Sequence, residues 1–329
     1  LLVDQLEDHY DNGLKHGKEL RTEVRFQIEE WEKGITRELS IDRDSMMRVI
    51  YVHSGFLAAI QNYTPELLEE LNGIADGAQL DRELVLAFNL GEEIYNFCTA
   101  NFESCSNLGV STEEVNYLAY NQDLPQFLHG KQKPVILKLP ESYVFTMPGS
   151  VGLSGVSKNF AVSCNSLPML KMNRQGLPLS FFLRKLLTLK SLNEAEAFIR
   201  ETPLAIGQNL MLASKTGIAN FEISNSEVKS LIPSEAGIVF HTNFPIENDE
   251  LKRDDYSDFQ CDRYEFLIKE VSGYSQVGDW SETLENTFST EPVFNLDTYL
   301  RFVASYSFES EPKVTFINPK SGETLNLLF

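Results

Sequence analysis

The sequence predicts an α+β fold in which a β-sheet sandwich is covered by helices. The front of the chain places apolar residues at helical spacing, whereas from about Val115 onward short β-branched and aromatic runs dominate. Helical segments interrupt those runs, which is typical of sheets packed under helices. With 329 residues, of which 42% are apolar, the chain can bury a sizeable core. We find no internal repeat and no linker that marks a domain boundary.

Three helices are predicted in the front part. Residues 1–33 carry a helical apolar pattern, and Gly34 is expected to end that helix. A second helix is expected to start after Thr64, a favourable N-cap, with Pro65 at the first helical position. The third is expected over residues 80–90.

The remaining helices and strands are predicted from changes in the spacing of apolar residues along the chain. Short runs bounded by Gly, Pro, Asn and Ser predict strands at 115–121, 133–140, 142–148, 159–166, 208–214, 217–224 and 237–243. Further helices are expected at 177–191, 191–201 and 258–271, and the end of the chain (312–329) is expected to form a hairpin. Ser191 and Glu194 have the spacing of a capping box.

Charge and hydropathy exclude some classes of partner. The net charge of −20 repels phosphate backbones, so we expect no nucleic-acid partner. No run approaches 18 apolar residues, so we expect no membrane span. The chain opens LLVDQL without Met, which is compatible with a cytoplasmic protein or with an exported one that has lost a targeting peptide.

The four cysteines, at positions 98, 105, 164 and 261, match neither a zinc pattern nor a dense disulfide framework. Cys98 ends an apolar helical stretch and is expected to be a buried core thiol. Cys105 differs, because it starts a predicted strand that shortly precedes another strand ending in the carboxylate of Asp123. A thiol so placed is a candidate nucleophile with an orienting partner.

The segment from Cys105 to Asp123 resembles the self-processing site of the acyl-coenzyme A:6-aminopenicillanic acid acyltransferase family of N-terminal-nucleophile (Ntn) hydrolases. The family pattern of Cys-Ser/Thr followed by Asn-x-Asp has its counterparts in Cys105-Ser106 and Asn121-Gln122-Asp123. Asp123 follows Cys105 by 18 positions and Cys98 by 25, and only the shorter spacing fits the family. The resemblance therefore selects Cys105.

The resemblance extends over nearly the whole chain. Stretches similar to family motifs follow in the family's order: YDNGLKHGKELR, LEELNGIADGA, LVLAFNLGEEI, NFAVSCNSL, LPLSFFLRKLL, ANFEIS and VFHTNFP. Such an ordered set is more specific than any one motif. It implies an Ntn αββα four-layer sandwich in which residues 1–104 form an N-terminal helical segment and residues 105–329 the core, together one composite domain.

The resemblance also implies a chemistry. An Ntn precursor cuts itself before the nucleophile, here between Ser104 and Cys105. The freed α-amino group, with a reference pKa of about 7.7–8.0, serves as general base, so no catalytic histidine is needed. The thiolate of Cys105 forms a thioester and passes the acyl group to water or an amine. No metal or organic cofactor is implied, and acyl-coenzyme A would be a substrate if transfer occurs.

The resemblance also implies roles for further residues, through their positions in the matching motifs. Asp123 is expected to hold the new amino terminus and the thiol in register, and Asn243, in VFHTNFP, matches the family's oxyanion donor. Asn165 is a second candidate donor, and Ser224 matches a serine that assists processing or substrate contact. Each also has a purely structural explanation as a polar residue at a strand end or turn.

For three other residues a structural role is the ordinary expectation. Arg263 could meet a substrate carboxylate, although a surface role is the ordinary expectation for an arginine. Cys164, within a predicted strand, is expected in the core, and His16 is expected to anchor the front helix by hydrogen bonding rather than to catalyse.

The sequence departs from its relatives at three positions. Ser104, not Gly, precedes the nucleophile, which suggests slower self-cleavage. Tyr120 stands where bile-salt and penicillin V amidases place an arginine, which argues against a bile-salt hydrolase and makes Tyr120 a candidate substrate contact. Gly91 replaces a basic residue that family members usually carry before their glutamate, here Glu93.

Three alternatives stay open. A papain-like thiol hydrolase would use Cys105 with His241 and Asn243 and would keep the chain intact. A non-catalytic homologue would bind acylated ligands without forming a thioester. A secreted binding module would depend on disulfides.

The sequence thus predicts an Ntn-type cysteine amidohydrolase or acyltransferase acting on an N-acylated small molecule, with hydrolysis the simpler class. The acyl chain, the amine, the oligomeric state (a homo-oligomer included) and the compartment are not determined by these patterns.

Overall fold

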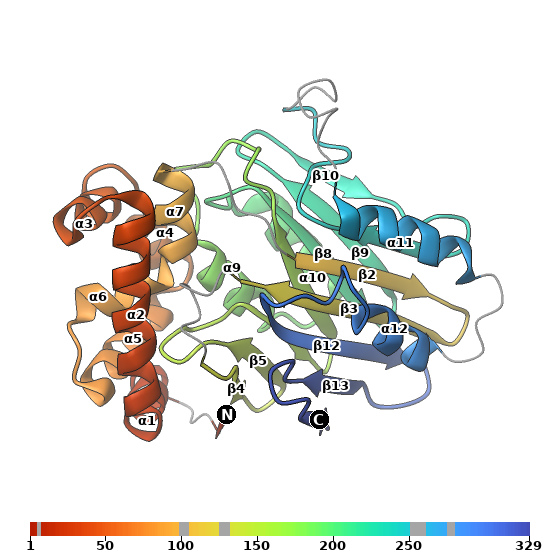
Figure 1. The fold of residues 1–329 in the computed structure, drawn as a ribbon, viewed down its shortest axis with the longest axis horizontal. Helices are drawn as coiled ribbons and strands as arrows, with labels where there is room; N and C mark the ends of the chain where they lie inside the picture. The colour runs from red at the N-terminus through yellow and green to blue at the C-terminus, as the bar shows by residue number, and fades with distance from the viewer. Residues whose placement is uncertain (5–7, 99–104, 125–131, 251–260, 275–279) are drawn as a thin grey trace.

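The computed structural model describes residues 1–329 except 5–7, 99–104, 125–131, 251–260 and 275–279. The front of the chain is helical, and its helices are grouped on one side of the molecule (Figure 1). They are α1 (His9–Glu19), α2 (Arg21–Leu39), α3 (Arg43–Tyr51), α4 (Phe56–Tyr63), α5 (Pro65–Ala78), α6 (Arg82–Asn89) and α7 (Gly91–Cys98). Among the described helices, none combines the length and apolar composition that crossing a bilayer requires.

The rest of the described chain is built on two sheets. The eight-stranded sheet has the order β1-β4-β5-β6-β7-β8-β9-β10. Its strands are β1 (Leu2–Asp4), β4 (Val135–Lys138), β5 (Ser142–Thr146), β6 (Ser154–Ser157), β7 (Phe160–Ser166), β8 (Gln208–Ser214), β9 (Gly217–Ile223) and β10 (Val228–Leu231). All of its pairings are antiparallel except that of β1 with β4, which is parallel.

The six-stranded sheet has the order β11-β2-β3-β12-β13-β14 and is antiparallel throughout. Its strands are β2 (Cys105–Ser111), β3 (Val115–Asp123), β11 (Ile238–His241), β12 (Thr298–Ser307), β13 (Lys313–Ile317) and β14 (Thr324–Leu327). Strands β2 and β3 pack against β7 and β8 of the other sheet. The outer face of this sheet is covered by α11 (Asp262–Ser272) and α12 (Trp280–Phe288).

On the other side, α9 (Leu179–Leu186) packs against β6, and α10 (Leu192–Glu201) lies beside it through the Phe182–Phe198 ring contact. The order of layers is therefore helices, sheet, sheet, helices. The expected αββα sandwich is confirmed.

Most of the expected elements are present. Each of the seven predicted strands overlaps an observed strand, the Ser191 side chain caps α10 by accepting from the Glu194 amide, and β13 and β14 form the expected hairpin. Pro65 opens α5 as expected. The strands β1, β6, β10 and β12 were not predicted from the sequence, and of these β12 lies in the middle of the six-stranded sheet.

Two expectations about the front of the chain are wrong. Residues 1–33 do not form one helix, because β1 precedes α1 and the helical conformation is interrupted at Leu20, between α1 and α2. Gly34 does not end α2 but lies buried inside it, where the apolar face formed by Trp31 and Ile35 continues across it. Packing of that face compensates for the low helix propensity of glycine.

Glycines allow α1 and α5 to cross at close range. A Cβ added at Gly13 would lie 1.8 Å from the Glu70 carbonyl oxygen, and one at Gly73 would lie 2.1 Å from the Tyr10 carbonyl oxygen. Only glycine leaves room for this approach of two backbones. His16, on α1, is buried and accepts a hydrogen bond from the Gly149 amide at 3.1 Å, so its expected anchoring role is confirmed.

A buried ion pair joins the helical front to the sandwich. Arg184 of α9 donates to both carboxylate oxygens of Glu70 on α5, at 3.1 and 2.9 Å, and to the Val151 carbonyl at 2.9 Å. The side chains of Arg184 and Glu70 are 2% and 1% exposed. Removing either residue would leave the other charge buried without a partner, so the pair stabilises the contact between the two parts of the chain.

Candidate active site

The alternation of side chains along β2 and β3 decides what surrounds Cys105. Leu108 and Ala119 belong to the apolar cluster under α11 and α12, whereas Cys105 and Tyr120 belong to the main core. Because successive side chains of a strand point to opposite faces, Cys105 and Tyr120 both face the space between the sheets. Cys105 pairs with Gln122 across the two strands, and this register places the Cys105 side chain on the same face as Tyr120.

The Cys105 thiol is buried beside a hydroxyl and a second thiol. The Tyr120 hydroxyl lies 3.4 Å from Cys105 Sγ and 2.7 Å from the Cys164 carbonyl oxygen, and its single proton can serve only one of them at a time. Burial, and next the charge of Asp123, raise the pKa of the Cys105 thiol to about 12. In the uncleaved chain the thiol is therefore protonated at neutral pH.

Two side chains hold the backbone of Cys105. Its N–H donates to Asn243 Oδ1 at 2.8 Å. Arg263 Nη1 donates to the Cys105 carbonyl oxygen and, at 3.0 Å, to Ser106 Oγ, while Arg263 Nη2 donates to Asn243 Oδ1 at 2.9 Å. Since Oδ1 accepts from two donors and Nδ2 donates to the Ser166 carbonyl at 3.0 Å, the orientation of the Asn243 amide is determined by its partners.

Asp123 lies at the end of β3, and two side chains hold its carboxylate. Oδ1 accepts from the Thr298 hydroxyl at 2.7 Å and Oδ2 from Asn295 Nδ2 at 2.8 Å. Burial raises the pKa of this carboxyl to about 6, although the Arg263 charge opposes the rise. A hydrogen bond from the Asp123 backbone reaches the Cys105 thiol and lowers its pKa.

Hydrogen bonds from Asn165 and Glu222 hold the backbone on both sides of Asn243. Asn165 Nδ2 donates to the carbonyl oxygens of His241 and Thr242, at 2.8 and 3.0 Å. The buried carboxylate of Glu222 bonds to His241 Nε2 at 2.7 Å and accepts from the backbone amides of residues 246, 247 and 248. These bonds fix the course of the chain on both sides of Asn243.

His241 is engaged away from the thiol. Its Nδ1 lies 2.7 Å from the Thr242 carbonyl oxygen and its Nε2 bonds to Glu222, so both ring nitrogens have partners other than Cys105. This geometry does not support the papain-like alternative, in which the imidazole takes the thiol proton.

Ser224 stands apart from this group. Ser224 lies in the turn between β9 and β10, where its Oγ accepts from the backbone amides of Ser226 and Glu227, both at 3.3 Å. Ser104, the residue before the expected cleavage point, lies outside the described residues.

The structure thus brings Cys105, Asn243, Tyr120 and Arg263 into direct contact, with Asp123 and Asn165 adjoining them through the backbone. It adds Thr298, Asn295 and Glu222, which sequence reasoning did not select. A signal for the first two would have been the pairing of β3 with β12, which places Thr298 opposite Asp123. That register is not readable from two segments this far apart in the chain.

The remaining cysteines are free thiols. Cys164 is buried in the core as expected, whereas Cys98 is exposed, so the expectation of a buried Cys98 is wrong. It is the last residue of α7, whose buried apolar residue, Ile94, lies one turn earlier. All four cysteines are unpaired, which does not support a disulfide-dependent module.

Comparison with known proteins defines the class. A family model described as acyl-coenzyme A:6-aminopenicillanic acid acyl-transferase matches residues 117–297, more than half of the chain. The chain belongs to this family. It is accordingly an enzyme of the Ntn acyl-amide hydrolase and acyltransferase kind, as the sequence resemblance implied.

Two solved structures are similar at low identity. One is a Caenorhabditis elegans ortholog of N-acylethanolamine-hydrolyzing acid amidase, with 15% identity and a TM-score of 0.47, covering 68% of this chain and all of that one. The other is a variant of conjugated bile acid hydrolase from Clostridium perfringens, with 12% identity and a TM-score of 0.40, covering 68% of this chain and 92% of that one. Among curated proteins, none matches the chain significantly.

Proposed function

We propose that the chain cleaves itself between Ser104 and Cys105 and then hydrolyses, or transfers, the acyl group of an N-acylated amine through a thioester on Cys105. The observation that carries the proposal is that side chains bind both backbone groups of Cys105: its N–H donates to Asn243 and its carbonyl oxygen accepts from Arg263. Contacts to both backbone groups of one residue suit a residue whose nitrogen becomes catalytic.

The first step is intramolecular. The Cys105 thiol attacks the Ser104 carbonyl carbon, the C–N bond breaks, and the nitrogen of Cys105 takes up the thiol proton. Water then hydrolyses the resulting thioester, leaving the Ser104 carboxylate and a free Cys105 α-amino group. The high pKa of the buried thiol opposes this step, and the departure from Gly to Ser at position 104 is expected to slow it further.

The new amino group changes the acid–base chemistry of the site. With a reference pKa of about 7.7–8.0, it takes the thiol proton near neutral pH. The thiolate then attacks the substrate carbonyl, and the leaving amine receives the proton back from the ammonium group. Water, or an acceptor amine, attacks the thioester to release the acyl group.

Asn243 is suited to hold this amino group. Its Oδ1 already accepts from the Cys105 nitrogen, so the same bond persists when the amide becomes an amine. Nδ2 has two N–H groups, and its bond to the Ser166 carbonyl uses one of them, which leaves the other for an oxyanion. The contacts of Asn165 suit a supporting role for the His241–Thr242 backbone.

Intact-mass analysis tests the proposal. The purified wild type is expected to give two fragments, 1–104 and 105–329, with Cys at the new amino terminus. Cys105→Ala is expected to stay at full length and to lack amidase activity. Cys98→Ala, which removes an exposed thiol from the same stretch, is the matched control and is expected to cleave. A full-length wild type that hydrolyses amides refutes the Ntn mechanism.

A further inference from the structure

Tyr120 places a buried hydroxyl against the sulfur of the proposed nucleophile. Because Cys105 pairs with Gln122 across β2 and β3, Tyr120 is the diagonal neighbour of Cys105 on the same face of the sheet. A diagonal position of this kind is within reach of an aromatic side chain. The Tyr120 ring is fully buried and meets Phe302 edge-on, with the ring centroids 5.6 Å apart. The packed ring therefore holds its hydroxyl 3.4 Å from Sγ.

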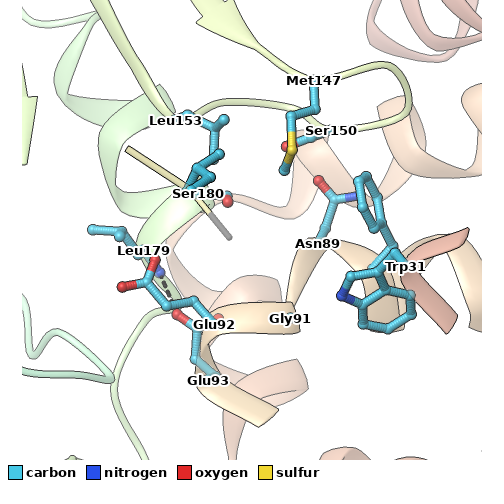
Figure 2. Close-up of a pocket in the computed structure, with 12 residues that line it drawn as sticks. Trp31, Asn89, Gly91, Glu92, Glu93, Met147, Ser150, Leu153, Leu179 and Ser180 are labelled. Atoms are coloured by element: carbon cyan, nitrogen blue, oxygen red, sulfur yellow. Dashed lines mark hydrogen bonds between the residues drawn. The ribbon is translucent and has the colours of Figure 1, made fainter. Parts of the chain in front are cut away.

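The single proton of this hydroxyl has two acceptors within reach. Besides the sulfur of the nucleophile, the Cys164 carbonyl oxygen lies 2.7 Å from the Tyr120 oxygen. The Cys164 thiol donates elsewhere, to the Leu153 carbonyl oxygen at 3.4 Å. Figure 2 shows Leu153 on the wall of a pocket that Glu92 and Glu93 of α7 also line. The Tyr120 proton can thus change acceptor by a turn of the O–H bond alone, without movement of the ring.

The surroundings make Tyr120 a donor and not a base. Burial raises the pKa of the Tyr120 hydroxyl well above its usual value, so the group keeps its proton at neutral pH. The charged groups near the sulfur act in opposite directions, because Asp123 raises the pKa of the Cys105 thiol and Arg263 lowers it. The Arg263 guanidinium donates to the Cys105 carbonyl oxygen and to Asn243 Oδ1. Tyr120 contacts the sulfur directly.

We propose that Tyr120 is a catalytic residue whose hydroxyl donates to the Cys105 thiolate, an inference that rests on the proposed function. While the thiol is protonated, the Tyr120 proton points to the Cys164 carbonyl oxygen. When the free α-amino group takes the thiol proton, the O–H bond of Tyr120 turns to the sulfur, and the tyrosine keeps its own proton throughout. Because the new acceptor is charged, the bond gained is about twice as strong as the neutral bond given up. The same donor assists the release of the thiolate when water or an amine cleaves the thioester.

Alkylation of Cys105 measures the predicted effect. The rate at which iodoacetamide modifies Cys105 is followed against pH by peptide mass spectrometry, which separates this thiol from the other cysteines. Tyr120→Phe removes only the hydroxyl oxygen and is expected to raise the midpoint of the Cys105 profile by about one pH unit or more, as the loss of a hydrogen bond to a charged group implies. Below that midpoint, kcat/KM for an N-acylated aminocoumarin is expected to fall about tenfold and to recover as the pH rises.

Tyr306→Phe is the matched control. Tyr306 is also fully buried, and its hydroxyl donates to the Ser157 carbonyl oxygen at 2.7 Å, the same distance that separates the Tyr120 hydroxyl from the Cys164 carbonyl oxygen. This variant loses a comparable bond to a main-chain carbonyl and is expected to leave the Cys105 midpoint unchanged. Equal midpoints in the wild type and Tyr120→Phe overturn the proposal, and so does an equal shift in the two variants.

A second measurement needs no substitution at position 120. Incorporation of 3-fluorotyrosine in place of tyrosine makes each phenol a stronger donor, and it is expected to lower the Cys105 midpoint in the wild type and in Tyr306→Phe. An unchanged midpoint in the fluorinated wild type overturns the proposal even where Tyr120→Phe does not fold. Intact mass separates the two hypotheses. A chain that stays uncleaved refutes the proposed function and the role of Tyr120 together, whereas a cleaved chain with one midpoint in all forms refutes the role of Tyr120 alone.

Discussion

Removing one member of the Glu70–Arg184 pair is expected to destabilise the whole chain. In Glu70→Gln the neutral amide leaves the Arg184 guanidinium buried without a counter-charge, and arginine cannot lose its proton. Although burial alone would raise the pKa of Glu70, the Arg184 charge lowers it, which indicates that the carboxylate is ionised in the folded chain. Breaking a buried pair of this kind costs about 3–5 kcal/mol of unfolding free energy.

Urea denaturation followed by tryptophan fluorescence measures this cost. The double variant Glu70→Gln/Arg184→Met removes both charges and is expected to be more stable than Glu70→Gln alone, because no unpaired charge remains. Asp76→Asn, which removes a partner of Arg82 at the surface, is the control and is expected to lose far less.

The result that refutes this reasoning is a loss of less than about 1 kcal/mol for Glu70→Gln, comparable to that of an ordinary surface substitution. The reasoning is also contradicted if the double variant loses more unfolding free energy than the two single variants lose together. Because α5 and α9 lie on opposite sides of the expected cleavage point, the same substitution is expected to weaken the association of fragments 1–104 and 105–329.

Three further predictions follow from other contacts. Arg263→Met removes a charged donor from the Cys105 carbonyl and is expected to slow self-cleavage about tenfold or more in a mass-spectrometric time course; an unchanged rate contradicts the role of Arg263. Since the pKa of Asp123 rises from 3.8 to about 6, this group binds its proton more tightly when folded, so its contribution to stability is lost as pH rises through 6. Asp123→Asn is therefore expected to gain up to about 3 kcal/mol relative to wild type between pH 4 and 7 in denaturation curves, and a constant difference refutes this. Gly13→Ala forces α1 away from Glu70 and is expected to lower stability by about 1–3 kcal/mol, which an unchanged unfolding midpoint would contradict.

Local sequence patterns predicted the elements well where short-range physics decides them. The change of period near Val115, the cap at Ser191 and the proline at position 65 each act within one turn or one strand, and the structure agrees at all three. Gly34 failed for the opposite reason. Its local propensity suggested a helix end, but the apolar face of α2 packs against the rest of the helical front and carries the helix on to Leu39.

The chemistry of the site was less accessible to sequence reasoning. Arg263 was expected at the surface, yet α11 places it against the Cys105 carbonyl and Asn243. Glu92 and Glu93 face a cavity made by elements from both parts of the chain. No local pattern reports such contacts, because they depend on how layers stack rather than on the order of residues.

The sequence by itself determined the αββα class, the strand that begins at Cys105 and the family to which the chain belongs, since period, turn residues and ordered motifs are local properties. Only the tertiary structure decided which partners surround each group. Strand register brought Thr298 to Asp123, and the alternation along β2 and β3 placed Tyr120 beside the thiol. Burial between the sheets then raised the pKa of Cys105, an effect that depends on long-range packing and therefore does not appear in any single segment.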